Sequence, residues 1–142
     1  MHGVNFDVLE RRDPSLYGGR SLSELEHQIE GWARAAGLEP LFFQTNHEGE
    51  FVEYLHRSRD LADGVLINAG AWTHYSRAIA DALGVAGLPA VEVHLSDVEA
   101  RDEWRKLSVF DGLVLAKIFG KGPDGYREAL ELLAGELGAG TG

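Results

Sequence analysis

A strand, a helix and a second strand follow one another within residues 65–93, VLINAGAWTHYSRAIADALGVAGLPAVEV. The apolar run at 65–67 is typical of a buried strand, residues 74–83 suit a helix, and residues 90–93 suit another strand. Two strands that are joined through a helix lie parallel in a sheet. This unit therefore predicts a parallel sheet with helices packed against it.

The same alternation continues on both sides of this unit. Toward the N-terminus we expect a helix from the capping box at residues 21–24 to Gly37, a strand at 38–44 and a helix at 50–61. Toward the C-terminus we expect a helical turn at 98–106, a strand at 113–118, and a last helix that carries Tyr126, Leu130, Leu133 and Leu137. This pattern predicts an α/β fold, a flavodoxin-like, doubly wound parallel sheet in three α/β/α layers. Residues 1–137 are expected to form a single domain and residues 138–142 a flexible tail.

Composition narrows the range of functions. Of the 142 residues, 44% are hydrophobic and 25% are charged, as expected of a soluble globular domain. The net charge of −10 opposes binding to nucleic acid, although a few arginines in one cleft can still attract a small anionic substrate. The lack of cysteine excludes disulfides and thiolate chemistry. With no secretion signal and no apolar run of about 18 residues, we expect a cytoplasmic protein without a membrane partner.

Ligands of this fold bind beyond the carboxyl ends of the strands, which directs attention to the loops there. Asn68 follows the strand at 65–67, and His74 comes at the start of the next helix. Their amide and imidazole groups are suited to hold substrate hydroxyls. The alternative is structural: Asn68 and Thr73 cap the turn, and His74 lies in solvent.

Glu92 and His94 are two residues apart on a predicted strand, so they face the same side of the sheet. Glu92 can then accept a hydrogen bond from His94, and an imidazole oriented by a carboxylate is a good general acid. The alternative is a partly buried Glu–His pair that serves only the structure.

The loop at residues 10–19 brings Arg11 and Arg12 close to Tyr17. Guanidinium groups beside a tyrosine favour its phenolate, which is a competent base. The two glycines that follow Tyr17 let the loop move as a lid. The alternative is that both arginines are simply solvated.

Arg101 and Arg105 lie four residues apart and are expected to share one helical face, where either can bind a substrate oxygen. The alternative is a surface ion-pair network with the acidic residues Glu99, Asp102 and Glu103. The sequence has no zinc motif of the His-Glu-x-x-His type, no phosphate-binding loop and no Gly-x-Ser-x-Gly elbow. Acid–base chemistry without a cofactor remains.

Six short blocks occur together in a distinctive order and spacing: Gly3-Val-Asn5, Arg11-Arg-Asp-Pro14 with Tyr17-Gly18, Gln44-Thr-Asn-His-Glu-Gly-Glu50, Ile67-Asn-Ala-Gly70 with Thr73-His74, Glu92-Val-His-Leu-Ser96, and Ala100-Arg-Asp-Glu-Trp-Arg105. In this order they resemble the type II 3-dehydroquinate dehydratases. The resemblance implies a cofactor-free anti elimination of water from 3-dehydroquinate through an enolate, in the shikimate pathway or in quinate breakdown. It implies no metal, Schiff base or nucleotide.

The resemblance also implies catalytic roles. Tyr17 would take a proton from C2 of the substrate, and Arg12 would stabilise the charge that develops. Asn5 would hold a water against the enolate oxygen. His94, oriented by Glu92, would protonate the departing C1 hydroxyl.

Further residues are implied to bind the substrate. The ring hydroxyls would be bound by Asn68, His74 and Arg105. The substrate carboxylate would be received by backbone N–H groups around Leu95 and Ser96. Asp81 matches an acidic residue that family members supply to a neighbouring subunit's site, which implies a trimer and, as is usual in the family, a dodecamer built from four of them.

The sequence departs from the family in two places that matter. The usual apolar opening strand is missing, and we expect it upstream of Met1 rather than a rearranged sheet. Glu10 stands where a glycine is usual and can compete with Tyr17 for a guanidinium. These departures motivate the alternative of a non-catalytic homologue that binds a shikimate-like ligand or acts in assembly, whereas the retained Tyr17, Arg12 and His94 favour an enzyme.

Overall fold

A parallel β-sheet forms the middle layer of the molecule in the computed structural model, which describes residues 1–141, with side chains described as far as residue 138. Its strands are β1 (Val65–Ile67), β2 (Ala90–Val93) and β3 (Ala116–Ile118), and they lie in that order. The pairs Val65 with Ala90 and Val91 with Ala116 belong to parallel ladders. The parallel arrangement predicted from residues 65–93 is therefore confirmed.

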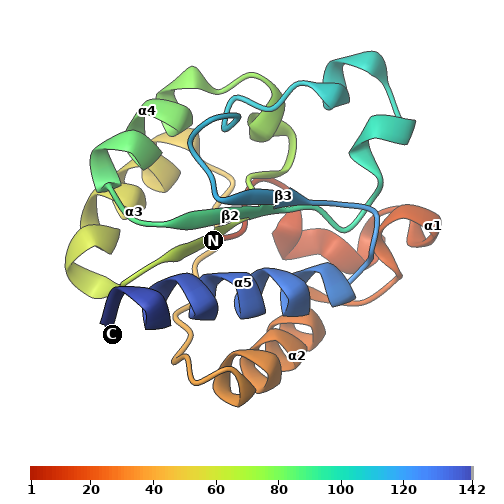
Figure 1. The fold of residues 1–142 in the computed structure, drawn as a ribbon. Helices are drawn as coiled ribbons and strands as arrows, with labels where there is room; N and C mark the ends of the chain where they lie inside the picture. The colour runs from red at the N-terminus through yellow and green to blue at the C-terminus, as the bar shows by residue number, and fades with distance from the viewer. Residues whose placement is uncertain (142) are drawn as a thin grey trace.

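Helices cover both faces of this sheet (Figure 1). On one face lie α2 (Leu22–Ala35) and α5 (Asp124–Thr141), and on the other lie α3 (Glu48–Leu61) and α4 (Arg77–Ala86). Each face has its own buried cluster, because Val91 and Val93 of β2 pack with α2 and α5, whereas Ala90 packs with α3 and α4. The predicted flavodoxin-like α/β/α layers are confirmed.

Short helical segments lie in the connections between these elements: the 3₁₀ helices η1 (Phe6–Arg11), η2 (Gly70–His74), η3 (Val98–Ala100) and η4 (Glu103–Lys106), and the single turn α1 (Pro14–Tyr17). The helical turn expected at 98–106 is thus divided into η3 and η4. The helix expected at 74–83 begins later, at Arg77, because the Ser76 side chain accepts the Ile79 N–H and caps it there. Ser21 caps α2 by accepting the Glu24 N–H, as the capping box predicts.

Two predicted strands are wrong in extent. Of the strand expected at 38–44, only Gln44 pairs, in a single bridge with His2, and the strand expected at 113–118 is shortened to β3. A β-strand requires a neighbour with which to exchange backbone hydrogen bonds, and an apolar sequence alone does not supply one.

The C-terminal end of the chain is more regular than expected, because α5 continues to Thr141, past residue 137. The flexibility of residues 138–142 stays a prediction, and Gly142 lies outside the described residues.

The first residues lie between the 43–45 segment and β1, where they act as a very short parallel strand. The His2 N–H donates to the Phe43 carbonyl at 2.8 Å, and the Gly3 N–H donates to the Asn68 carbonyl at 2.8 Å. A side chain at Gly3 would clash with the chain, since a Cβ there would lie 2.2 Å from the Ala69 carbonyl oxygen. The sheet therefore extends beyond β1 by two bridges, from Asn68 to His2 and from His2 to Gln44.

The Met1 amine is buried beside β1 and donates to the Leu66 carbonyl at 2.7 Å. Burial lowers the pKa of this amine to about 5. Next to it lies a groove with a volume of about 450 Å³, whose apolar walls include Ile29, Leu38, Phe42, Leu66, Leu130 and Leu133. The expectation of an opening strand upstream of Met1 stays a prediction. No helix in residues 1–141 is long and apolar enough to cross a membrane.

Candidate functional site

A narrow cavity of about 20 Å³ lies at the carboxyl ends of the strands, at the end of the sheet that is next to α1 in Figure 1. Most of the residues predicted for the site line it, namely Arg12, Tyr17, Asn68, His74, His94, Leu95, Ser96 and Arg105. They come from three separate connections of the chain: the segment before α2, the connection from β1 to α4, and the connection from β2 to β3. The structure therefore brings together residues that are far apart in the sequence.

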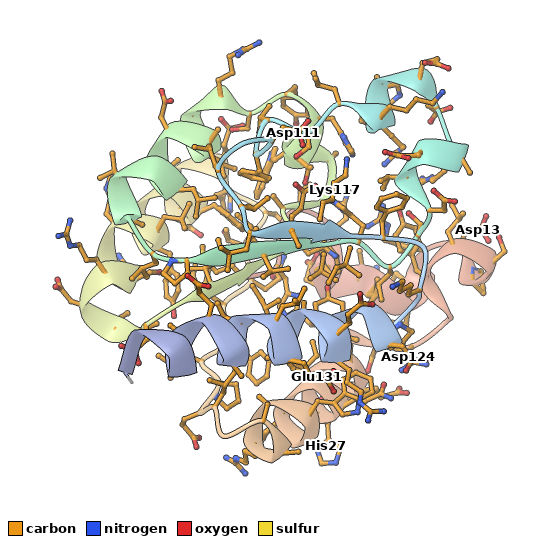
Figure 2. The ribbon with its side chains drawn as sticks, viewed as in Figure 1. Asp13, His27, Asp111, Lys117, Asp124 and Glu131 are labelled. Atoms are coloured by element: carbon orange, nitrogen blue, oxygen red, sulfur yellow. The ribbon has the colours of Figure 1, made fainter. Side chains whose placement is uncertain are left out.

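The short turn α1 places Tyr17 at this cavity. Asp13 caps the turn, because its side chain accepts the Ser15 N–H at 2.9 Å, and Gly18 ends it with a positive φ of 83°. Figure 2 shows Asp13 at the outer edge of the molecule, where the Ser15 hydroxyl and N–H hold the pKa of its carboxyl below the ordinary value. Tyr17, at the other end of the same turn, is buried and faces the cavity.

Two guanidinium groups meet at the Tyr17 hydroxyl. Arg12 Nη2 donates to it at 2.7 Å, and Arg101 Nη1 donates to it at 2.8 Å. The Arg12 guanidinium also lies over the Tyr17 ring, 3.9 Å from its centre. Burial lowers the pKa of Arg12, and the nearby Tyr17 oxygen partly offsets this effect. Such charge-assisted contacts stabilise a phenolate more than a neutral phenol.

The sequence predicted this arrangement only in part. Arg11 was the second arginine expected near Tyr17, but it is exposed, and Arg101 takes that place. Arg101 was one of two arginines considered able to bind a substrate oxygen, and it donates to the Ser96 hydroxyl at 3.1 Å. Its contact with Tyr17 spans 84 residues, so no local pattern indicated it.

Glu92 and His94 form the pair that their spacing predicts. His94 Nε2 donates to Glu92 Oε2 at 2.6 Å, and both side chains are buried. The second carboxylate oxygen of Glu92 accepts from the Ser108 hydroxyl at 2.7 Å. Because His94 also lines the cavity, the pair presents an oriented imidazole to whatever the cavity binds.

The structural alternative stated for these two residues agrees with the contacts of Asn68 but not with those of His74. The Asn68 amide donates to the Tyr126 hydroxyl at 2.9 Å and accepts the Gly70 N–H at 3.3 Å, so it does hold the turn. His74 is buried instead of solvated, and its Nδ1 donates to the Leu107 carbonyl at 2.7 Å. Burial lowers the pKa of His74, an effect that the Leu107 carbonyl partly offsets, and the ring is therefore neutral near pH 7.

The contacts of Arg105 agree with both of its interpretations, a surface ion pair and a residue that binds substrate. Its guanidinium forms an ion pair with Asp102 at 3.4 Å and lies 4.1 Å from the centre of the Trp104 ring. It also lines the cavity, as expected of a substrate-binding residue. Leu95 and Ser96 line the cavity as well, and their carbonyls accept the Gly122 and Gly120 N–H groups, which hold this part of the wall.

Comparison with known proteins identifies the group to which the chain belongs. A family model described as dehydroquinase class II matches residues 1–134. The chain belongs to this family. It is 47% identical over 131 residues to the 3-dehydroquinate dehydratase of Syntrophotalea carbinolica, and the aligned region covers 92% of this chain and 88% of the relative. It is 45% identical over 138 residues to that of Pelobacter propionicus, with 96% and 92% covered.

A solved structure agrees with this assignment to the class II dehydroquinases. The type II dehydroquinase from Propionibacterium acnes superposes with a TM-score of 0.89 at 38% identity, over 94% of this chain and 92% of that one. At this identity and coverage, the likeness extends to nearly the whole fold. The resemblance stated from the six sequence blocks is confirmed.

Three residues predicted for the dehydroquinase site are not part of the cavity walls: Glu92, which lies behind His94, and the exposed Asn5 and Asp81. Asn5 is exposed beside the cavity residue Phe6 and has a positive φ of 71°, and its N–H donates to Asn46 Oδ1 at 2.8 Å. Asp81 is exposed on α4. The role of Asp81 in the site of a neighbouring subunit stays a prediction.

The competition expected from Glu10 is not seen in this class II dehydroquinase. Glu10 is exposed and forms no ion pair in the part of the chain that the structure describes, whereas Arg12 donates to Tyr17. Among the described residues, no group of three or more His, Asp and Glu side chains is arranged to hold a metal ion. The phenol, imidazole and guanidinium groups gathered at the cavity are themselves suited to proton transfer and to binding of an anion.

Proposed function

We propose that this chain dehydrates 3-dehydroquinate to 3-dehydroshikimate, with Tyr17 as base and His94 as acid. One observation carries the proposal: a tyrosine hydroxyl held by two guanidinium groups and an imidazole held by a buried carboxylate line the same cavity. Curated relatives named 3-dehydroquinate dehydratase support this choice of reaction.

The first step is removal of the proton from C2 of the substrate. The Tyr17 phenolate accepts this proton, and the C–H electron pair moves into an enolate whose charge lies on the carbonyl oxygen. Arg12 and Arg101 stabilise the phenolate before the step and keep Tyr17 in place. We assign to Asn5 the binding of a water molecule against the enolate oxygen.

The second step is loss of the C1 hydroxyl. The enolate electrons re-form the carbonyl and create the C1–C2 double bond as the C1–O bond breaks, and His94 protonates the departing oxygen, so that water leaves. Glu92 orients the imidazole and stabilises its protonated form until that transfer. Neutral His74 cannot add a second positive charge near His94, whose ring centre lies 6.1 Å away.

Substrate binding is proposed to follow the lining of the cavity. Ring hydroxyls contact Asn68, His74 and Arg105, and backbone N–H groups near Leu95 and Ser96 receive the carboxylate. The cavity is small, about 20 Å³, and movement of part of its wall is proposed to admit the substrate. The 10–19 segment carries Arg12 and Tyr17 and is the proposed lid.

The assembly and the location of the enzyme are proposed from the resemblance. We place the chain in trimers that build a dodecamer, with Asp81 of one subunit reaching the site of the next, and we place it in the cytoplasm. The alternative of a non-catalytic homologue is not favoured, because Glu10 leaves Arg12 free to contact Tyr17 and the proposed base and acid face one cavity.

The test is an assay of the purified chain with 3-dehydroquinate, followed by the ultraviolet absorbance of the conjugated enone of the product. We expect turnover that withstands a chelator and borohydride. Tyr17→Phe and His94→Ala should each abolish most of it, whereas the control variants Tyr75→Phe and His27→Ala, at exposed positions, should leave it unchanged. Figure 2 shows His27 on the outer side of α2. Near wild-type rates in both site variants would contradict the mechanism.

A further inference from the structure

The segment from Leu107 to Phe110 lies behind both imidazoles of the site. The Leu107 carbonyl accepts from His74 Nδ1 at 2.7 Å, and the next residue, Ser108, donates its hydroxyl to Glu92 Oε1 at 2.7 Å. This segment is held against the end of η2, because the Val109 N–H donates to the Thr73 carbonyl at 2.8 Å. A loop outside the predicted site therefore supplies the partner of His74 and contacts Glu92, the partner of His94.

Ser108 has its hydroxyl fixed in one orientation. Its oxygen accepts the Phe110 N–H at 3.1 Å, and its single proton is then directed to Glu92. The side chain is only 5% exposed, so water does not readily replace either contact. The result is a chain of hydrogen bonds from Phe110 through Ser108 to Glu92, which His94 joins from the other side.

Glu92 depends on these donors because it is 0% exposed. A buried carboxylate keeps its charge only where hydrogen bonds replace the water it has lost, and here each oxygen has one donor. Without the Ser108 hydroxyl, Oε1 would lose its donor, and the carboxylate could rotate or take up a proton. Either change would release His94 from its present tautomer and orientation.

We propose that Ser108 is a positioning residue of the site, which keeps Glu92 a fixed anion and so aligns His94 as the proton donor. The kinetic consequence of this inference rests on the proposed function. Its structural consequence rests on the hydrogen-bond geometry alone. Ser108 acts through Glu92 and not on the substrate. Its hydroxyl is therefore expected to affect the rate of the reaction more than the binding of substrate.

The kinetic test compares Ser108→Ala with Ser108→Thr, which keeps the hydroxyl. We expect the alanine variant to lower kcat about tenfold or more with KM changed less than twofold, and the threonine variant to recover most of the rate. The matched control is Ser58→Ala, because Ser58 is equally buried but donates to the Tyr54 carbonyl in α3, away from the cavity. It should keep the wild-type kcat.

The pH dependence of kcat is a second measurement. It would not change if Ser108 only supported the fold. In Ser108→Ala, activity should be lost at a lower pH on the alkaline side, because the imidazolium of His94 no longer has a fixed anion beside it. The other charged or titratable groups at the cavity are His74, Tyr17 and the guanidinium groups of Arg12, Arg101 and Arg105. All of these groups are present in the wild-type chain and in Ser108→Ala, so a shift of the pH profile reports on Glu92.

A test without substrate separates this inference from the proposed function. The ¹⁵N and ¹H spectra of the imidazoles, assigned with His94→Gln, should give a single tautomer of His94 in the wild-type chain and an exchanging or altered one in Ser108→Ala. An unchanged His94 spectrum in a folded Ser108→Ala variant would overturn the inference, even if the wild-type chain proved inactive. A loss of kcat that Ser58→Ala reproduced in full would overturn it as well.

Discussion

Removal of Arg101 should slow the reaction without abolishing it. Arg101→Leu deletes one of the two charged donors to the Tyr17 hydroxyl, at 2.8 Å, and leaves Arg12 at 2.7 Å. A hydrogen bond to a charged group contributes about 1.5–3 kcal/mol. At about 1.4 kcal/mol for each factor of ten, this loss corresponds to a decrease in kcat of roughly 10- to 150-fold. The remaining contact of Arg12 explains why the decrease should be smaller than that of Tyr17→Phe.

The assay must separate two roles of Arg101, because the same Nη1 atom also donates to Ser96 at 3.1 Å. Initial rates with 3-dehydroquinate would be measured for Arg101→Leu, for Ser96→Ala, and for the exposed control Arg127→Leu. We expect Arg101→Leu to act mainly on kcat, Ser96→Ala mainly on KM, and the control on neither. A kcat of Arg101→Leu within twofold of wild type would refute a base held by two cations, and so would a Ser96→Ala variant that reproduced the full loss.

Other predictions concern stability. Gly3→Ala should lower the free energy of unfolding by about 1–3 kcal/mol or more, because its Cβ would lie 2.2 Å from the Ala69 carbonyl oxygen, and an unchanged urea midpoint would contradict the close approach. Ser21→Ala should cost about 1 kcal/mol through the lost helix cap, seen as a lower Tm in thermal unfolding. Burial lowers the pKa of His2 and of His74 below 6.5, so the unfolded chain binds protons that the folded chain excludes. Stability should therefore fall as pH decreases, from about pH 8 because of the Met1 amine and below about 6.5 because of the two histidines, by at most about 1.4 kcal/mol per pH unit for each group. Urea midpoints that stayed constant from pH 7.5 to 5 would contradict this sign.

Features that depend on neighbours in the sequence were predictable. The capping box at Ser21 and the side-by-side placement of Glu92 and His94 follow from the fixed repeats of a helix and a strand. The strand expected at 38–44 failed for the opposite reason, since pairing depends on a partner from elsewhere in the chain, and only His2 lies beside it.

The site shows the same difference between contacts that are local in the sequence and contacts that are not. Tyr17 and Arg12 are five residues apart and were expected to meet, whereas Arg101 reaches Tyr17 across 84 residues of sequence. Ser108 gave no signal at all, because a serine in a loop is common and its importance here comes from the buried carboxylate that it contacts. Long-range contacts of ordinary residues are what sequence patterns fail to reveal.

The apolar groove beside Met1 has a practical consequence for measurements of stability. Leu41 and Leu61 belong to its walls and remain 58% and 51% exposed, so the groove is accessible from solvent in the folded protein. Fluorescent dyes that report melting respond to accessible apolar surface. Such a dye should already be bright with this protein at room temperature, which lowers the contrast of its signal on heating. Thermal scans that follow the emission of the three tryptophans, of which Trp72 is buried, would give the clearer transition.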